Sequence, residues 1–285
     1  MGLVTAFYNA EVLEVGIDWI TATGKEGDTC ELLATIAAEA RTGAEECGFF
    51  TRRLAFQGYA GYGGEGWFFG TRPDSACLRL SGSTAHRLCR DVAMVDCHVS
   101  RFDAQVTLRD TTVGPDYARQ VIDAWRNDTR GKASVDKLRT KLVDAGMDGT
   151  TAYFGAKAAA RHSRIYDKHA ESQGTYPPHT WRCEAEIKRQ LAGPAWERIT
   201  GVDFDRGFLL GFIKGWFAHQ GVHLTFQGGV PLEVPIVTRV TSDAERKLEW
   251  LKKTAQPVVR QLCEAGYSAQ VADALYGWLM PEAEK

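Results

Sequence analysis

The chain has 285 residues, of which 44% are hydrophobic and 25% are charged, and its formal net charge at pH 7 is −2. The length allows one large domain or about two ordinary ones, and the composition is that of a globular protein rather than a disordered one. A charge so close to neutral excludes nucleic-acid binding driven by the overall charge of the protein. Any DNA binding must therefore come from a local basic groove.

Cysteine content and hydropathy indicate in which cellular compartment the protein is expected. The seven cysteines are odd in number and include no Cys-x-x-Cys pair, which predicts free thiols in a reducing, cytoplasmic environment. The first residues lack the basic and apolar regions of a signal peptide. No apolar stretch approaches the ~20 residues that a membrane span requires. We therefore expect a cytoplasmic protein without a membrane partner.

The first part of the chain is predicted to combine one helix with several strands. Apolar and polar residues alternate at 12–21, as in a strand, and the alanine-rich residues 30–46 have the pattern of a helix that Gly48 closes. The glycine run at 61–66 precedes a strand-like segment and no helix, so we expect a hairpin turn there rather than a phosphate-binding loop. Antiparallel strands are expected at 49–58, 66–70 and 76–81.

The rest of the chain is predicted to alternate helices and strands before a helical C-terminus. Ser83 predicts the start of a helix at 83–94, and Pro115 begins another at 115–126. Near the C-terminus, residues 242–245 form a capping box, and Gly266 separates two further helices. Strands are expected at 98–109, 150–155, 163–168 and 181–188, and a helix at 204–217.

Hairpins mixed with helices favour an α+β fold, with an antiparallel central sheet and flanking helices, over alternating βαβ units. We expect three regions in the chain. Residues 1–200 form a catalytic domain, and residues 201–237 form a connecting segment that glycines and prolines interrupt. Residues 238–285 form a small helical C-terminal module.

The segment Arg164-Ile165-Tyr166-Asp167-Lys168 carries the most specific chemistry. In an extended conformation, alternation puts Arg164, Tyr166 and Lys168 on one face. Tyrosine ionises near pH ~10, so a phenoxide at neutral pH costs about 4 kcal/mol, and adjacent cations reduce that cost. A phenol between two cations is a candidate nucleophile for a phosphodiester. The alternative is a surface strand without chemistry.

Three carboxylates lie on predicted strands. Asp103 is surrounded by apolar residues, and a buried carboxylate must either bind a cation or form an ion pair, here with Arg101 or Arg79. Glu184 and Glu186 alternate onto one face if their segment is a strand, and they separate if it begins a helix. That strand face also carries Arg182 and Lys188.

Histidines and basic residues flank these motifs. His162 and His169 lie on either side of the tyrosine segment, and we expect exposed loop histidines, with acid–base chemistry as the alternative. Residues 126–141 contain six basic and two acidic side chains, which predicts either a DNA-binding surface or a solvated helix face. The basic residues are Arg126, Arg130, Lys132, Lys137, Arg139 and Lys141. Among the tryptophans, Trp67 and Trp181 are candidates for stacking on an unpaired base.

Five motifs follow one another along the chain: Gly16-Ile17-Asp18-Trp19, Arg101-Phe102-Asp103 with Thr107, Tyr153-Phe154-Gly155, Arg164 to Lys168 with Glu171, and Trp181-Arg182-Cys183-Glu184. Their types and order resemble the Rep_trans family. These proteins are replication initiation factors of rolling-circle plasmids and filamentous phages, and they are related to relaxases of mobile elements. The resemblance covers roughly residues 12–190.

The resemblance implies a fold like that of relaxases and rolling-circle initiators, and a DNA nicking-joining endonuclease. Tyr166 is expected to attack one strand at the origin, leaving a 5′-phosphotyrosine link and a free 3′-hydroxyl that primes synthesis. Arg164 and Lys168 are expected to stabilise charge on the phosphate. Glu171 is expected to orient one of these two cations.

The resemblance also implies a cofactor and partners. Asp103, Glu184 and Glu186 are expected to hold Mg²⁺ or Mn²⁺, ions that prefer carboxylate oxygens. The chain lacks the His-hydrophobe-His pair of many other rolling-circle nickases, which agrees with Rep_trans. The expected partners in the bacterial cytoplasm are origin DNA, single-stranded or as a hairpin at the nick site, a second copy of the chain, and a host helicase.

Three other functions are open at the level of the sequence. A relaxase of a mobilisable or integrative element would use the same chemistry for another purpose, and the sequence does not separate it from a replication initiator. A non-catalytic DNA-binding regulator on the same scaffold would bind the origin without a metal-dependent nick. An unrelated α+β binding protein would do neither and would fit the near-neutral charge best.

Overall fold

The computed structural model describes residues 4–25, 27–129, 140–232 and 258–272. The chain divides into two compact units, residues 1–236 and 237–285. None of the helices in the described residues is long and apolar enough to cross a membrane.

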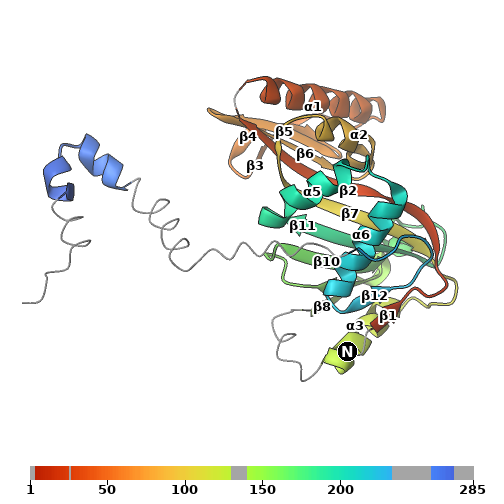
Figure 1. Cartoon of the computed structure of the whole chain (residues 1–285). Coiled ribbons are helices and arrows are strands. Elements are labelled where there is room, and N and C mark those ends of the chain that lie inside the picture. The colour runs from red at the N-terminus through yellow and green to blue at the C-terminus, as the bar shows by residue number, and fades with distance from the viewer. Residues whose placement is uncertain (1–3, 26, 130–139, 233–257, 273–285) are drawn as a thin grey trace, which may run out of the picture. The chain divides into compact units, whose positions relative to one another are not determined.

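The described residues of the first unit include ten strands that form one sheet, in which every neighbouring pair is antiparallel (Figure 1). In spatial order the strands are β3 (Arg52–Phe56), β4 (Tyr59–Gly64), β5 (Trp67–Arg72), β6 (Ser75–Ser81), β2 (Glu11–Lys25), β7 (His98–Arg109), β11 (Thr180–Lys188), β10 (Arg161–Asp167), β9 (Thr150–Phe154) and β8 (Thr140–Asp144). A separate parallel pair joins β1 (Val4–Ala6) to β12 (Val222–Leu224). The α+β class with an antiparallel central sheet is thereby confirmed.

Helices flank this sheet (Figure 1). They are α1 (Asp28–Glu46), α2 (Ser83–Ala93), α3 (Tyr117–Thr129), α4 (Lys168–Glu171), α5 (Ala192–Thr200) and α6 (Arg206–His219), with short 3₁₀ turns at Gly146–Asp148 and Arg189–Leu191. Helices α1 and α2 pack against β5, β6 and β2, and α5 and α6 pack against β7. Helix α3 packs against β8 and β9.

The two faces of the sheet differ in chemistry, as β7 shows. Phe102 is fully buried, and its ring centroid lies 5.4 Å from that of Trp196 on α5 and 6.2 Å from that of Phe212 on α6. Successive side chains of a strand point to opposite faces. The intervening Asp103 and Gln105 therefore point to the other face. The hydrophobic core lies between the sheet and the helices, and polar side chains gather on the opposite face.

The glycine run was predicted to be a turn, and this prediction was wrong. Residues Tyr59–Gly64 form strand β4, and the turns lie at 57–58 and 65–66. A side chain at Gly61 would place its Cβ 2.0 Å from the carbonyl oxygen of Phe69 on β5. The glycines therefore allow the backbones of neighbouring strands to approach closely. A run of glycines in a sequence is compatible with this role as well as with a turn.

Residues expected in the connecting segment add to the first unit. Helix α6 is buried along most of its length and packs on β2, β7 and β11. The side chain of Asp205 begins this helix by accepting a hydrogen bond from the Phe208 backbone N–H at 2.8 Å. In the second unit, residues 258–264 and 268–272 are helical, and Gly266 between them has a φ of +91°. The capping box at 242–245 lies outside the described residues.

Candidate active site

Tyr166 lies on the polar face of the sheet, in strand β10. The antiparallel register of β10 and β11 pairs Tyr166 with Arg182 and Arg164 with Glu184. Directly opposed residues of an antiparallel pair point to the same face. The phenol, two guanidinium groups and one carboxylate are thus brought together by strand pairing alone.

The Tyr166 hydroxyl donates a hydrogen bond to Glu184 Oε1 at 2.5 Å. Arg164 donates to the other oxygen, Glu184 Oε2, and its guanidinium carbon lies 5.2 Å from the centre of the Tyr166 ring. Tyr166 is only 6% exposed. Burial raises the pKa of Tyr166, Glu184 raises it further, and Arg182 and Arg164 act in the opposite direction. The phenol is therefore neutral at rest and is hydrogen-bonded to a candidate base.

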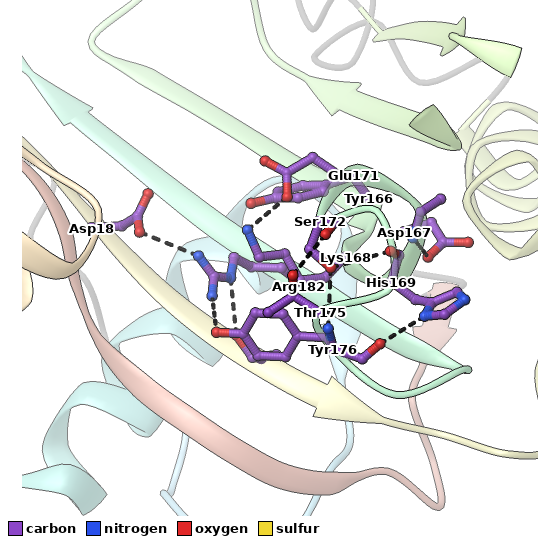
Figure 2. Close-up of polar contacts among 12 residues, drawn as sticks. Asp18, Tyr166, Asp167, Lys168, His169, Glu171, Ser172, Thr175, Tyr176 and Arg182 are labelled. Atoms are coloured by element: carbon purple, nitrogen blue, oxygen red, sulfur yellow. Dashed lines mark hydrogen bonds and ion pairs between the residues drawn. The ribbon is translucent and has the colours of Figure 1, made fainter. Parts of the chain in front are cut away.

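Lys168 reaches the tyrosine from a helix rather than from the strand. Asp167 ends β10 and caps α4, because its Oδ1 accepts the Ala170 backbone N–H at 3.0 Å. The Lys168 Nζ forms an ion pair with Glu171 at 2.6 Å and lies 5.9 Å from the centre of the Tyr166 ring (Figure 2). Glu171 therefore contacts Lys168 and not Arg164.

The packing of α4 against the sheet depends on one glycine. Gly149 has a φ of +81°, which favours glycine, and a Cβ there would lie 2.8 Å from the Ala170 Cβ. A larger residue would push α4, and Lys168 with it, away from the sheet.

Arg182 is the most connected cation of the face (Figure 2). Its Nη1 lies 3.2 Å from Asp18 Oδ1, and its Nη2 lies 3.4 Å from Glu14 Oε2. Its Nε donates to the hydroxyl of Thr107 at 2.9 Å, and its Nη2 donates to that of Tyr176 at 3.1 Å. The sequence pattern placed Arg182 only on a strand face and indicated no role for Glu14, Asp18 or Tyr176. Asp18 could have been identified from the sequence, because it belongs to the motif Gly16-Ile17-Asp18-Trp19.

Gly16 and Trp19, which belong to the same motif as Asp18, also make specific contacts in the structure. A Cβ on Gly16 would lie 2.1 Å from His86 Nδ1, so the histidine ring covers the backbone here and would have to move for any larger residue. The Trp19 ring lies under two guanidinium groups, 4.4 Å from that of Arg101 and 5.4 Å from that of Arg79. Burial, followed by the Glu184 carboxylate, raises the pKa of Asp18.

Two predicted metal ligands lie in ion pairs beside this cluster. Both oxygens of Asp103 accept hydrogen bonds from Arg101, at 2.9 and 2.6 Å. Glu186 contacts His162 Nδ1 at 2.7 Å, Lys188 Nζ at 2.9 Å and Arg101 Nη1 at 3.1 Å. Burial raises the pKa of Asp103 to about 7, although Arg101 acts in the opposite direction. The ion pair with Arg101 is the one that the sequence left open for Asp103.

The expectation that both flanking histidines are exposed loop residues was wrong. His162 lies on β10, is buried, and stacks on the Tyr153 ring with a centroid distance of 5.5 Å. His169, on α4, is half-buried and contacts the Tyr176 backbone carbonyl through Nδ1 at 2.7 Å. Neither is an exposed loop residue, because the strand and the helix around the tyrosine extend further than the alternation indicated.

The donor set does not match a divalent cation in this arrangement. Within the described residues, no three His, Cys, Asp or Glu side chains are grouped as a metal site requires. Glu184, Asp103 and Glu186 instead direct their oxygens at Arg164, Arg101, Lys188 and His162. The charge of these carboxylates is already balanced by cations of the protein, so we assign no chemical step to a metal.

Two predicted DNA contacts and two predicted stacking residues can be located. Arg126 lies in the last turn of α3 and Lys141 on β8, at the edge of the sheet. Arg130, Lys132, Lys137 and Arg139 lie outside the described residues. Trp67 and Trp181 are 3% and 1% exposed, so both are core residues and neither can stack on a base.

Comparisons with known proteins include a likeness of fold to a solved structure. No family model matches the chain, and no curated protein matches it. A solved structure described as a rolling circle replication initiator protein from Geobacillus stearothermophilus is similar with a TM-score of 0.48 and 17% identity, over 70% of this chain and 83% of that chain. The function proposed below depends on the geometry of the site and not on this likeness.

Proposed function

We propose that the chain is a DNA nicking-joining enzyme of the rolling-circle initiator type, with Tyr166 as its nucleophile. One observation carries the proposal: the Tyr166 hydroxyl lies 2.5 Å from Glu184 Oε1, while Arg164 holds the other oxygen of the same carboxylate. A nucleophile, a base and a cation within hydrogen-bond reach are the parts that attack on a phosphodiester requires.

The chemistry is a transesterification. The phenol oxygen of Tyr166 attacks phosphorus and its proton passes to Glu184, a bond from phosphorus to the phenol oxygen forms, and the bond from phosphorus to the 3′-oxygen breaks. The proton on Glu184 can then return to the departing 3′-oxygen. The products are a 5′-phosphotyrosine link and a free 3′-hydroxyl. Because the link keeps the phosphodiester energy, the reverse reaction joins strands without ATP.

Activation of the phenol is coupled to substrate binding in this proposal. At rest Arg164 neutralises Glu184, and burial keeps the pKa of Tyr166 above its ordinary value. An entering phosphate competes for Arg164 as a bidentate partner. Glu184, once released from that partner, is free to accept the proton of the phenol. Arg164, Arg182 and Lys168 then face the charge that grows on the phosphate in the transition state.

DNA binding is supported by the region next to the site on the same face. Trp19, Arg101 and Arg79 combine a ring with two cations within 5.4 Å of it, and Phe56 lies 5.0 Å from Arg79. Aromatic rings interleaved with arginines suit unpaired bases and their backbone phosphates. The substrate is therefore a single-stranded or extruded segment that crosses β2 toward Tyr166. Arg126 and Lys141 offer further phosphate contacts at the other edge of the sheet.

The test is a nicking assay on supercoiled DNA that carries the origin of the element encoding the chain, with Mg²⁺, with Mn²⁺ and with EDTA. We expect nicked circles and a covalent protein–DNA adduct, which peptide mass spectrometry locates on Tyr166. Tyr166→Phe removes the adduct and leaves DNA binding intact. Tyr153→Phe is the matched control, because Tyr153 lies on the neighbouring strand and contacts His162 instead.

Two results would overturn the proposal. An adduct that persists in Tyr166→Phe identifies another nucleophile. Origin binding without any nick, under all three ionic conditions, identifies a non-catalytic regulator. Relaxases use the same chemistry, so a conjugation assay on the native element, comparing transfer with replication, assigns the enzyme to one of the two processes.

A further inference from the structure

The outer part of the sheet carries positive charge that the near-neutral composition of the chain conceals. Strands β3, β4, β5 and β6 lie side by side at one end of the sheet, beyond β2 (Figure 1). Together they contain four arginines and no aspartate or glutamate. The arginines are Arg52, Arg53, Arg72 and Arg79. This end of the sheet is therefore a local basic surface, which DNA binding requires in a protein of net charge −2.

Strand pairing arranges cations in one row on the polar face. The row consists of directly opposed residues on seven neighbouring strands, from β11 to β3. In order, its members are Lys188, Arg101, Thr21, Arg79, Phe68, Gly63 and Arg52. Opposed residues point to the same face, and Arg101 shares the polar face with Asp103. Neighbouring strands are about 4.8 Å apart, so the row runs about 29 Å from the strand of Glu184 to the edge of the sheet.

The balance of charge changes along this row. At its inner end, Lys188 pairs with Glu186 at 2.9 Å, and Arg101 pairs with Asp103 at 2.6 Å. Beyond β2 the arginines of the polar face form no ion pair with any carboxylate in the part of the chain that the structure describes. The uncompensated charge therefore begins at β6 and continues to the edge strand β3.

Arg79 is held among aromatic rings instead of carboxylates. Its guanidinium carbon lies 5.0 Å from the centre of the Phe56 ring, 5.4 Å from that of Trp19 and 5.9 Å from that of Phe68. Its Nε is buried without a hydrogen-bond partner among the described residues, and burial lowers the pKa of Arg79. The nearby Cys77 thiol is neutral at pH 7, because burial raises its pKa to about 11. An anion from outside the chain would offset the desolvation of this guanidinium.

Arg72 extends the basic surface along β5. Its guanidinium carbon lies 4.2 Å from the centre of the Tyr59 ring. Its Nε donates a hydrogen bond to the Gly58 carbonyl at 3.1 Å, and its Nη2 donates to that of Gln57. These contacts hold the exposed side chain against the turn between β3 and β4. Its remaining N–H groups are free to donate to the phosphate of a ligand.

We propose that the outer basic surface, formed by Arg52, Arg72 and Arg79, binds the single-stranded flank of the DNA that Tyr166 cuts; this rests on the function proposed above. Phosphates of the flank contact the guanidinium groups, and its bases lie against the adjacent rings. The ligand is single-stranded because only unpaired bases offer their faces to rings and guanidinium planes. The row sets the path of the strand, which crosses β2 and leaves the sheet at β3.

Protection of an edge strand is the alternative role for these arginines. Charged side chains on an edge strand prevent it from pairing with strands of other chains. Arg52 and Arg53 are neighbours on β3, and alternation puts Arg53 on the opposite face, where its guanidinium carbon lies 5.9 Å from the centre of the Tyr62 ring. Both side chains protect the edge, but only Arg52 lies on the polar face. The two positions therefore separate DNA binding from edge protection.

The test is a binding measurement by fluorescence anisotropy on the full chain with Tyr166→Phe, so that no strand is cut. One single-stranded oligonucleotide contains the nick site alone, and two others extend it on the 5′ or the 3′ side by about 15 nucleotides, near the upper size of such binding sites. We expect one extended oligonucleotide to bind about tenfold more tightly or better at about 0.15 M salt, since each phosphate contact contributes about fourfold.

Substitutions then locate the contact. We expect Arg52→Gln to weaken binding of that extended oligonucleotide about fourfold, and to lower the slope of log K against log salt concentration by about 0.7, the loss of one phosphate contact on a single strand. Arg72→Gln has the same effect. Arg53→Gln is the matched control and changes neither quantity. Arg52 is exposed, so its substitution does not act through the fold, and thermal unfolding of each variant verifies this.

Two results would overturn this inference and leave the proposed function intact. The first is equal affinity for the short and the extended oligonucleotides, while the wild-type chain still forms the Tyr166 adduct. The second is equal weakening by Arg52→Gln and Arg53→Gln, because the effect is then one of net charge. A double-stranded extension that binds as tightly as the single-stranded one overturns the assignment to single strands.

The opposite combination concerns the proposed function. Tighter binding of an extended oligonucleotide, by a chain whose wild-type form makes no covalent adduct, overturns the nicking activity. It leaves the outer basic surface as a binding site for single-stranded DNA.

Discussion

Arg101 donates to both carboxylate oxygens of Asp103, two residues further along β7 on the same face. Asp103 is 2% exposed, and the Arg101 guanidinium also covers the Trp19 ring at 4.4 Å. The pair therefore connects a buried carboxylate to the aromatic surface beside the active site. It also determines what removal of either partner does to the protein.

Loss of the guanidinium leaves the Asp103 charge buried without a partner. We expect Arg101→Met to lower the free energy of unfolding by about 3 kcal/mol, the typical cost of breaking a buried pair. Asp103→Asn is expected to cost less, since an amide carries no charge. Urea denaturation of both variants and of the double variant measures the coupling. A double variant less stable than Arg101→Met alone would contradict this account.

The planar guanidinium group of Arg182 contacts four other groups, and the ammonium group of a lysine cannot reproduce this geometry. We expect Arg182→Lys to reduce the rate of nicking by about 10²-fold or more, the effect of removing one preorganised donor, while DNA affinity changes little. A gel assay of nicking with a parallel binding measurement checks this. Arg198→Lys, on α5, is the control. Unchanged nicking by Arg182→Lys would show that charge alone matters at position 182, and equal losses in both variants would show that the effect is not specific to this arginine.

From the contacts of Glu186 we expect part of the free energy of unfolding to depend on pH in the acid range. Although burial acts in the opposite direction, His162, Arg101 and Lys188 lower the pKa of Glu186 from 4.5 to about 2. A carboxyl whose pKa is lower in the folded state stabilises the fold above its unfolded pKa. This contribution is lost as the pH falls from 4.5 toward 2.

We expect Glu186→Gln to lower the free energy of unfolding at pH 7 by about 1–2 kcal/mol, after allowance for solvent screening. The same variant should flatten the dependence of stability on pH below 4.5, where the wild-type chain loses the Glu186 contribution. Thermal unfolding of both proteins between pH 2 and pH 7, at about six values, provides the comparison. Parallel pH curves for the two proteins would contradict the prediction.

Trp19 is predicted to stack on an unpaired base. We expect Trp19→Ala to weaken binding of a single-stranded oligonucleotide by about 1–3 kcal/mol, and binding of duplex DNA less. Fluorescence anisotropy with both ligands measures the two affinities. Tyr8→Ala is the control, because Tyr8 is 77% exposed and lies outside this cluster. Equal weakening for single-stranded and duplex DNA would exclude base stacking.

Sequence patterns were sufficient to predict what depends on neighbours along the chain. Alternation at 181–188 predicted that Glu184 and Glu186 share a face with Arg182 and Lys188, and the register of β11 with β7 and β10 confirms it. Alternation failed at Lys168, because the side chain of Asp167 ends the strand and begins a helix. A short polar residue that can cap a helix overrides the strand pattern that precedes it.

The parts of the site that come from distant segments could not be predicted. Glu14 contacts Tyr176 across 162 positions of sequence, and Asp18 contacts Arg182 across 164. Alternation assigns a face to each strand but does not say which strands adjoin. The order β2-β7-β11-β10 is set by long-range pairing. That order alone brings the Gly16–Trp19 motif close to the Trp181–Glu184 motif.

This order also determines when the cluster around Tyr166 can first form during synthesis of the chain. Strand β2 leaves the ribosome early, yet the tyrosine, its base and Arg182 are on β10 and β11, which emerge more than a hundred residues later. Contacts of such high sequence separation form late in folding. A chain that ends before β11 therefore lacks Arg182 and Glu184, and the polar cluster around Tyr166 cannot form in it.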